Sequence, residues 1–545
     1  MTRRHIRRRG GPMAFAAVLL PCCVLALARP GAATTLDAAA IGCHPEWPVT
    51  AHNPDGHAVP PPAHDAHRTV ACAVTTGQET SESTIAVSAG GAVFYSPAHT
   101  ENTMARSLDG GATWSLVQPA TMQMTALWNT VDPQVVTDRR TGRIFWVHAT
   151  GQLRTAPVLV SNSPLPPPIP TIVAYASGFQ VYSTADDGHT WRTADYSNSP
   201  MGDWEKIAAG PAPDAGTGAA QPSGYRGLVY VCANSPFEVS GPSRLCWRSL
   251  DGGTTFAPAG YVLPVTTAGI CPPLASNTQV VGSDGTLYVP MTCSGGAYVA
   301  VSTDEGGTYT WYPVPSAPVA SSITPTAVLQ IAADSAGNLY GMWVANDQLM
   351  LTVSRDHART WSTAQSVAAP GVHQVTLPAF AADAPGHVAF AYYASSDGSA
   401  TALSAYITRT DDALASPPLL VSAAVNDPRH PIYTPSSVFA NSHPRADYVG
   451  AAFDSRGTFW AGLVDVLGPP PSSGADTPTT GYVAHLASMQ DTDATVQAAA
   501  TNPAATAAAP LALPNTAAAG STALAASAAV LTAAWVRRRR SRGAP

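Results

Sequence analysis

The chain has 545 residues, of which 12% are charged, and a formal net charge of −7 at neutral pH. Eleven of its 28 basic residues stand at the two ends, so the long stretch between them carries 17 Lys and Arg against 35 Asp and Glu. Because phosphate binding depends on a basic surface, this balance argues against a nucleic-acid partner.

The N-terminal residues 1–33 have the layout of a secretory signal peptide. Five arginines precede an apolar run from about Met13 to Leu27, and small residues follow up to Ala33. A basic head, an apolar stretch and a small-residue cleavage site are the three parts of such a signal. We therefore expect export, with cleavage near Ala33.

Cysteine usage agrees with an oxidising destination. Removal of the signal leaves six cysteines, which allow 15 pairings. Sequence neighbours give the simplest set, so we expect three disulfides: Cys43 with Cys72, Cys232 with Cys246, and Cys271 with Cys293.

Residues 34–78 are rich in histidine: His44, His52, His57, His64 and His67. On a helix, His64 and His67 would share a face and could hold a metal ion. The run Pro60–Pro62 discourages a helix there. We therefore expect a solvated linker with no bound metal and no cofactor, part of which could supply a strand to the following domain.

One short motif recurs five times in residues 79–490, first as "SLDGGATW" from Ser107 to Trp114. Its aspartates are spaced 77, 65, 53 and 52 residues apart and are Asp109, Asp186, Asp251, Asp304 and Asp356. A second repeat, an Asp/Gly turn followed by an aromatic strand, occurs seven times between and around them. Short alternating strands with a long-period repeat predict an all-β propeller of four-stranded antiparallel blades, seven being favoured and six possible.

The chemistry of the motif predicts a structural role. An Asp carboxylate can accept several backbone N–H groups in a turn, glycine can take a positive φ, and the aromatic residue can be buried between strands. We expect each copy in the turn between the third and fourth strands of a blade. The fifth copy has Ala358 in place of glycine, and the sixth and seventh blades show no clear copy.

After the predicted propeller, residues 491–512 are an Ala/Thr/Pro-rich stretch that predicts a stalk. Residues 513–545 begin with Leu513, Pro514 and Thr516, continue with 20 uncharged residues from Ala517 to Val536, and end with arginines. This order resembles a bacterial cell-wall sorting signal, with Ala517 where that signal has glycine. It implies a protein anchored to the cell wall or membrane.

The repeated motif itself resembles the Asp-box of the sialidase superfamily, over about Glu79–Asp465. In that family the Asp-box turns face away from the active site, which would put Arg106, Arg248 and Arg355 on the far face. The resemblance implies an exo-acting glycoside hydrolase such as an exo-α-sialidase. Such enzymes use three arginines, a Tyr–Glu nucleophile pair and an Asp acid/base, and the family's Arg-Ile-Pro signature is not found here.

Residues just before each innermost strand are expected at the mouth of the central channel. They are mostly acidic: Glu79, Glu82, Asp132, Asp203, Glu205, Lys206, Arg445, Asp447 and Tyr448. From these we select Glu82, Asp132, Arg445, Asp447 and Tyr448 as candidate catalytic residues. Tyr448 and Glu82 could imitate the nucleophile pair if the last blade closes against the first. In the structural alternative, Asp132 and Asp203 cap strand entries or accept turn hydrogen bonds, and Tyr448 packs in the core.

A single mouth arginine favours a monomeric binding or adhesion module for a glycan or protein ligand over a working sialidase. The alternative is a glycoside hydrolase of the sialidase superfamily. Three arginines converging at the mouth would favour that alternative.

Overall fold

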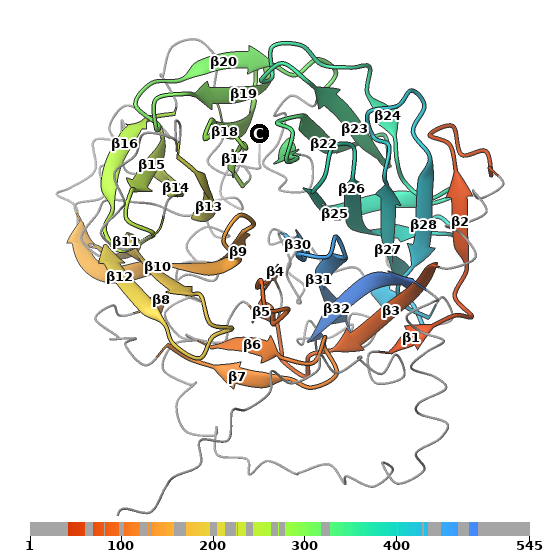
Figure 1. Ribbon diagram of the computed structural model, residues 1–545, viewed down its shortest axis with the longest axis horizontal. Coiled ribbons are helices and arrows are strands. Elements are labelled where there is room, and N and C mark those ends of the chain that lie inside the picture. Colours follow the sequence, from red (N-terminus) through yellow and green to blue (C-terminus); the bar gives the residue numbers. More distant parts are fainter. Residues whose placement is uncertain are drawn as a thin grey trace, which may run out of the picture. The chain divides into compact units, whose positions relative to one another are not determined.

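The computed structural model describes the main domain in segments, and everything below concerns those residues. They are 42–59, 69–80, 82–97, 103–119, 128–129, 133–156, 171–196, 204–212, 225, 227–235, 243–262, 271, 278–317, 328–399, 402–427, 430–433, 448–466 and 479–488. Seven antiparallel sheets surround a central channel (Figure 1), which confirms the all-β propeller and its favoured seven blades. Among these residues no helix is long and apolar enough to cross a membrane.

Blades 1 to 3 follow one another along the chain, each running from the channel outward. Blade 1 consists of β4 (Ser83–Val87), β5 (Val93–Pro97), β6 (Met104–Ser107) and β7 (Ser115–Val117). Blade 2 has β9 (Gln134–Asp138), β10 (Arg143–Ala156), β11 (Thr171–Thr184) and β12 (Arg192–Tyr196), with β8 (Trp128–Asn129) also on β10. Blade 3 has β13 (Lys206–Pro211), β14 (Gly227–Ser235), β15 (Ser243–Ser249) and β16 (Ala257–Tyr261).

Blades 4 to 6 repeat the same order. Blade 4 has β17 (Val280–Val281), β18 (Leu287–Cys293), β19 (Gly296–Ser302) and β20 (Thr310–Pro313). Blade 5 has β21 (Gln330–Ala333), β22 (Leu339–Ala345), β23 (Gln348–Ser354) and β24 (Gln365–Ser366). Blade 6 has β25 (His373–Ala382), β26 (Val388–Ser395), β27 (Ala402–Thr410) and β28 (Leu420–Ala424), extended by β2 (Val49–His52) and β29 (Ile432–Tyr433).

Blade 7 joins the two ends of the domain. Its inner strands are β30 (Gly450–Phe453), β31 (Phe459–Val466) and β32 (Thr479–Ser488), and its outer strand is β3 (Thr69–Thr75) from the N-terminal segment. The still earlier β1 (Cys43–His44) pairs with β3. Ser83 Oγ at the start of blade 1 donates to Gly462 O of β31 at 2.8 Å. The last blade therefore closes against the first.

The five repeated motifs all lie between the third and fourth strands of blades 1 to 5, as predicted, and we call them the Asp turns. In the first, Asp109 accepts the Ser107 hydroxyl at 2.7 Å, the Thr113 N–H at 2.9 Å and the Thr113 hydroxyl at 2.6 Å. The other four repeat the pattern with Asp186, Asp251, Asp304 and Asp356. At the imperfect copy, Ala358 adopts φ 68° in the place of glycine.

Blade 6 carries a reduced form of this turn, which corrects our expectation that it lacks one. Thr410 donates to Asp412 at 2.8 Å between β27 and β28, and Asp412 accepts the N–H of Leu419 at 2.9 Å. The hydroxyl and carboxylate of the motif remain, but its glycine and aromatic residue do not. Blade 7 has no third-to-fourth turn because its fourth strand comes from the other end of the domain.

The arginines near the Asp turns tie neighbouring blades together, on the face away from the inner-strand starts. Arg106 donates to the carbonyl of Asp187 in the next blade at 3.0 Å, and Arg248 donates to the carbonyl of Glu305 at 2.9 Å. Arg355 likewise reaches the carbonyl of Leu414. These guanidinium groups have structural partners, which agrees with placing them on the far face.

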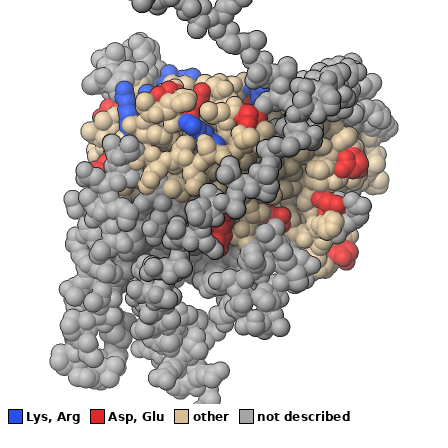
Figure 2. Space-filling model, turned by 90° about the horizontal axis from the view of Figure 1, so that it is seen from below, with Lys and Arg blue, Asp and Glu red and all other residues tan. Residues whose placement is uncertain are grey.

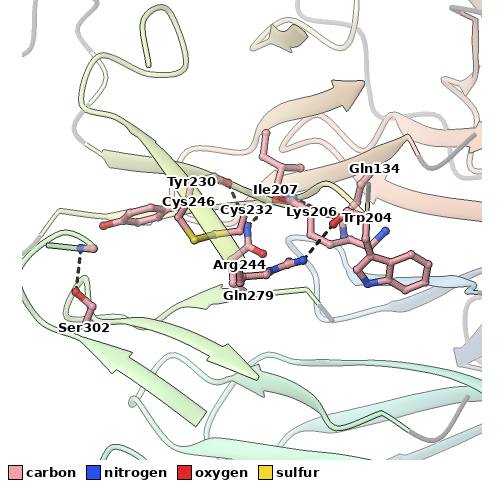
Figure 3. The surroundings of a disulfide bond; sticks show 11 residues. Gln134, Trp204, Lys206, Ile207, Tyr230, Cys232, Arg244, Cys246, Gln279 and Ser302 are labelled. Atoms are coloured by element: carbon pink, nitrogen blue, oxygen red, sulfur yellow. Dashed lines mark hydrogen bonds between the residues drawn. A yellow bond between two sulfur atoms is a disulfide. The ribbon is translucent and has the colours of Figure 1, made fainter. Parts of the chain in front are cut away.

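The three expected disulfides are present. Cys43–Cys72 joins β1 to β3, Cys232–Cys246 joins β14 to β15, and Cys271–Cys293 fixes the approach to blade 4 onto β18. Cys232 and Cys246 are direct partners in the strand register and are buried with Tyr230 beside them (Figure 3).

The histidine-rich segment differs from a solvated linker at two positions. His52 is fully buried in β2, where its Nε2 lies 2.8 Å from the Ser422 hydroxyl. His44 lies in β1 and stacks on Trp47. The reason is that the edges of blades 6 and 7 accept these short strands, which the neighbouring prolines could not reveal. His57 is exposed, and His64 and His67 lie outside the described residues.

Candidate functional site at the channel mouth

The innermost strands of the seven blades enclose a cavity of about 550 Å³ along the channel. Small and aliphatic side chains line most of its length, among them Ala208, Ile331, Ala379 and Ala451. Its charged lining residues are Asp138, Arg139, Arg140 and Asp334 at the far ends of inner strands, and Lys206 at the start of β13. Of these charged residues, Lys206 alone stands at the mouth.

The mouth is bridged by an aromatic and cationic cluster. The Nζ of Lys206 lies 4.3 Å from the ring centroid of Trp204 and 4.3 Å from that of Tyr448. The two rings meet edge to face at 5.8 Å. Trp204 and Lys206 precede and begin the inner strand of blade 3, whereas Tyr448 precedes that of blade 7. Because at least two blades separate blades 3 and 7 on either side, the cluster spans the channel.

Trp204 holds an uncommon backbone conformation, with φ 65°. Bulky residues rarely occupy this left-handed region, and such outliers concentrate at functional sites. Its carbonyl accepts a hydrogen bond from Arg244 Nη1 at 3.3 Å, and Figure 3 shows this guanidinium reaching from β15 toward the tryptophan. The buried side chain of Arg244 thus holds the strained backbone of Trp204 in place.

Two further charged residues lie behind the mouth. Glu205 is fully buried, and its Oε1 accepts the Ala149 N–H at 2.9 Å. Burial lowers the pKa of Arg244 to about 9, an effect that the negative charge of Glu205 opposes. Both charged side chains are thus buried behind the mouth.

Glutamine and threonine side chains fasten the tops of the inner strands to one another. Gln134 accepts the Ile207 N–H at 2.6 Å and donates to the Thr278 hydroxyl at 2.8 Å. Gln279 donates to the Lys206 carbonyl at 2.7 Å, and Gln330 donates to the Pro378 carbonyl at 2.6 Å. The bonds of Gln134 and Gln279 fix the position at which the Lys206 backbone enters the mouth.

Two of the five predicted catalytic residues lie in the described part of the chain. Glu82 is 3% exposed and precedes β4, and Tyr448 is 9% exposed and precedes β30. Their strands are neighbours across the closure of the ring, so both stand on the same side of the mouth. The ring of Tyr448, however, packs against Lys206 and Trp204. Asp132, Arg445 and Asp447 lie outside the described residues.

Sequence reasoning placed Lys206 at the mouth but gave it no role. One signal was available: Lys206 is the single lysine among 28 basic residues of the chain. Its pairing with two aromatic rings depends on strands that meet only when the ring is closed, so no local pattern could reveal it.

The described surface that Figure 2 draws is sparsely charged. On the face drawn in Figure 2, acidic side chains are scattered over the described surface, while the basic ones gather near its upper edge. The described residues of that face form no continuous basic surface.

No family model and no curated protein matches the sequence. Solved structures of sialidases and other propellers are similar to the chain in fold. The NanB sialidase from Streptococcus pneumoniae shares 12% identity over 85% of this chain and 70% of its own, with a TM-score of 0.35. The leech intramolecular trans-sialidase shares 13% over 75% and 68%, with a TM-score of 0.36.

A third similar structure is a mutant of AofleA from Arthrobotrys oligospora, with 11% identity over 63% of this chain and 87% of its own, and a TM-score of 0.37. Identities and TM-scores this low assign no activity to the present chain.

Proposed function

We propose that the protein is an exported, surface-anchored β-propeller that binds a glycan or protein ligand at the mouth of its central channel. The observation that carries the proposal is the cluster of Trp204, Lys206 and Tyr448. Aromatic rings and a cation at a rigid, concave position are the usual anchors of a binding site.

The same cluster disfavours catalysis by Tyr448. A tyrosine nucleophile needs its hydroxyl beside a general base and open to substrate. Here the ring faces of the cluster are engaged with the ammonium of Lys206, and the tyrosine is largely buried.

The test uses the chain shortened before Leu513, which removes none of the seven blades because these lie within residues 42–488. We expect no release of sialic acid from a chromogenic sialoside. On glycan and surface-protein arrays we expect a ligand whose binding falls at least about tenfold in Trp204→Ala, the loss of a central aromatic anchor.

Leu116→Ala is the matched control, since Leu116 is exposed on the outer strand β7 far from the channel. Its array signal should equal that of the parent protein. Turnover of the sialoside that disappears in Tyr448→Phe or Glu82→Gln would instead establish the alternative, a glycoside hydrolase of the sialidase superfamily.

Surface anchoring is a separate part of the proposal. The stalk at residues 491–512 and the anchor at residues 513–545 lie outside the described residues, and the sequence motif Leu513, Pro514, Thr516 supports the anchor. Cells that produce the full chain should retain it, and the shortened chain should appear in the medium. Retention of the shortened chain would show that another segment holds it.

A further inference from the structure

Blade 7 carries two cysteines and a histidine in one row across its outer strands. Cys43 of β1 is the register partner of Cys72 in β3, and Cys72 is also the register partner of His485 in β32. Figure 1 shows these three strands side by side. Register partners point to the same face of a sheet, so the three side chains converge. One sulfur from each cysteine and a ring nitrogen of His485 all lie within 4.8 Å of one another.

The ring of His485 is held in the form that can bind a metal ion. The residue is 6% exposed, and burial lowers its pKa to about 4, so the imidazole is neutral at neutral pH. Its ring packs against that of Trp460 at a centroid distance of 4.4 Å, and the indole N–H of Trp460 donates to Asp454 Oδ2 at 3.3 Å. No hydrogen bond to another described residue engages the imidazole. A neutral imidazole with an unused nitrogen is the usual metal-binding form of histidine.

In the oxidised protein the two sulfur atoms of this group are joined in the Cys43–Cys72 disulfide. Cys43 is only half-buried, in a strand at the edge of its sheet, whereas the other five disulfide-bonded cysteines are buried. The rate of thiol–disulfide exchange depends on access to the sulfur that is attacked. A reductant in solvent therefore reaches this disulfide before it reaches the two buried ones.

We propose that reduction of this disulfide turns Cys43, Cys72 and His485 into a zinc-binding site. Two thiolates and one imidazole are ligands that Zn²⁺ prefers, and its short bonds of about 2.0–2.3 Å need ligand atoms grouped as closely as these. The half-buried Cys43 leaves the fourth position of the ion open to water. The site goes beyond the proposed function, because it lies on the outer strands of blade 7 and not at the channel mouth. It also revises our expectation of a chain without metal.

The reaction that opens the site is a thiol–disulfide exchange with a thiol reductant. A thiolate of the reductant attacks the Cys43 sulfur, the bond to Cys72 breaks, and Cys72 leaves as a thiolate. A second thiol of the reductant then releases Cys43, so the two cysteines gain two electrons and the reductant becomes a disulfide. Zn²⁺ binds both cysteines as thiolates, and any proton that they carry passes to solvent.

Zinc is the probe, added to the chain shortened before Leu513 after reduction under native conditions by a water-soluble phosphine, which takes oxygen from water and becomes its oxide. The zinc content is measured after unbound metal has been removed. We expect one tightly bound zinc ion per reduced chain and none per oxidised chain. Cobalt in place of zinc should give the charge-transfer absorption of a thiolate-bound metal. A reduced chain without zinc, or an oxidised chain that holds as much as the reduced one, would overturn the proposal.

His485→Phe keeps an aromatic ring beside Trp460 and removes the nitrogen ligand. We expect zinc to bind the reduced variant at least about tenfold more weakly than the reduced parent. The matched control is His148→Phe, because His148 is also buried against a tryptophan ring but belongs to blade 2 and is not one of the three clustered residues. Its reduced form should bind zinc like the parent. Equal zinc affinity of reduced His485→Phe and reduced parent would refute the site.

Alkylation provides a test on the parent protein, should His485→Phe fail to fold. Iodoacetamide should modify Cys43 in the reduced, metal-free chain, because a free thiolate is a nucleophile and Cys43 is half-buried at a sheet edge. An equimolar amount of zinc should slow this modification at least about tenfold, whereas Ca²⁺, which prefers oxygen ligands, should leave it unchanged. Modification of Cys43 at the same rate with and without zinc would refute the site. Ligand binding at the channel mouth is scored separately, so either proposal can fail without the other.

Discussion

Arg139 of blade 2 and Asp383 of blade 6 form an ion pair across the far end of the channel, although 244 residues separate them in the sequence. The same guanidinium donates to the carbonyl of Ala382 at 2.5 Å. Two contacts thus join blades across the channel. This ion pair lies at one end, and the cation–π contact of Lys206 with Tyr448 lies at the other.

We predict that Arg139→Gln lowers the free energy of unfolding by about 1 kcal/mol at neutral pH, the value of a partly exposed pair. Burial alone would raise the pKa of Asp383, but hydrogen bonds from His387 and the charge of Arg139 outweigh it, so the pKa is lowered. Because the pKa of Asp383 is lower in the folded than in the unfolded state, its ionised form stabilises the fold at pH values above the unfolded-state pKa. This contribution is lost as the pH falls through the folded-state pKa.

The difference between Arg139→Gln and the parent should therefore be constant above about pH 5 and shrink below about pH 4. Denaturant titrations across this range measure it. Arg359→Gln is the control, because Arg359 is exposed and its hydrogen bond goes to the carbonyl of Asp356 in its own turn, not to another blade. A difference that does not change with pH would show that the ion pair is not its source.

A second prediction concerns the Asp turns. Asp251 accepts four hydrogen bonds, from Ser249, from the N–H of Thr254, and from both the N–H and the hydroxyl of Thr255. Asp251→Ala leaves these donors without their acceptor and should lower the free energy of unfolding by about 1–3 kcal/mol. Leu250→Ala in the same turn should change it by less than about 0.5 kcal/mol, since Leu250 is exposed. Equal effects would contradict the structural role of the carboxylate.

The Cys232–Cys246 disulfide gives a third prediction. It closes a loop of 14 residues inside blade 3 and is buried on both sides. The chain-entropy relation for such a loop gives about 3 kcal/mol, so the double variant Cys232→Ser, Cys246→Ser should lose about that much stability. Peptide mapping without reduction should find the two cysteines linked. Alkylation of both as free thiols in the folded protein would contradict the pairing.

The fourth prediction concerns acid. Burial lowers the pKa of His148 to about 3, and among the described residues neither of its ring nitrogens has a hydrogen-bonding partner. Because the pKa of His148 is depressed in the folded state, its protonation does not reduce the free energy of unfolding above about pH 6.5. The free energy of unfolding then falls as the pH decreases toward 3. His148→Phe, which retains an aromatic ring beside Trp146, should remove this dependence.

Thermal unfolding at pH 7 and pH 4.5 tests the predicted effect of His148→Phe. The variant should gain stability relative to the parent by more than about 1 kcal/mol on going to the lower pH. His57→Gln, at an exposed site, should show no such gain. A parallel decline of His148→Phe and parent would assign the acid sensitivity to other groups.

The propeller was predictable because its information is local and repeated. Seven aromatic strands correspond to seven blades, and the Asp turns lie where their hydrogen-bonding chemistry predicted. The turn of Thr410 and Asp412 was missed because it retains the polar half of the motif without the glycine and aromatic residue that made the others visible.

The candidate site was less predictable because it is built across the ring. Glu82, Lys206 and Tyr448 were predicted at the mouth because each comes just before or at the start of an innermost strand. The contact of Lys206 with Tyr448 could not be predicted in this way, because it depends on the order of the blades and on closure of the ring. The same holds for His52, whose burial comes from pairing with blade 6 and not from its own neighbours in sequence.

The pairing of β3 with β32 determines when β3 can complete its sheet during folding. β3 is the first long strand of the domain, and its partner β32 is the last strand. The six other blades lie between them in the sequence, so β3 cannot pair until the whole domain has been synthesised. Until then β3 keeps an unpaired strand edge, and such edges accept strands from other chains. Exchange of β3 between two open rings is the low-cost route by which this chain would dimerise or aggregate under stress.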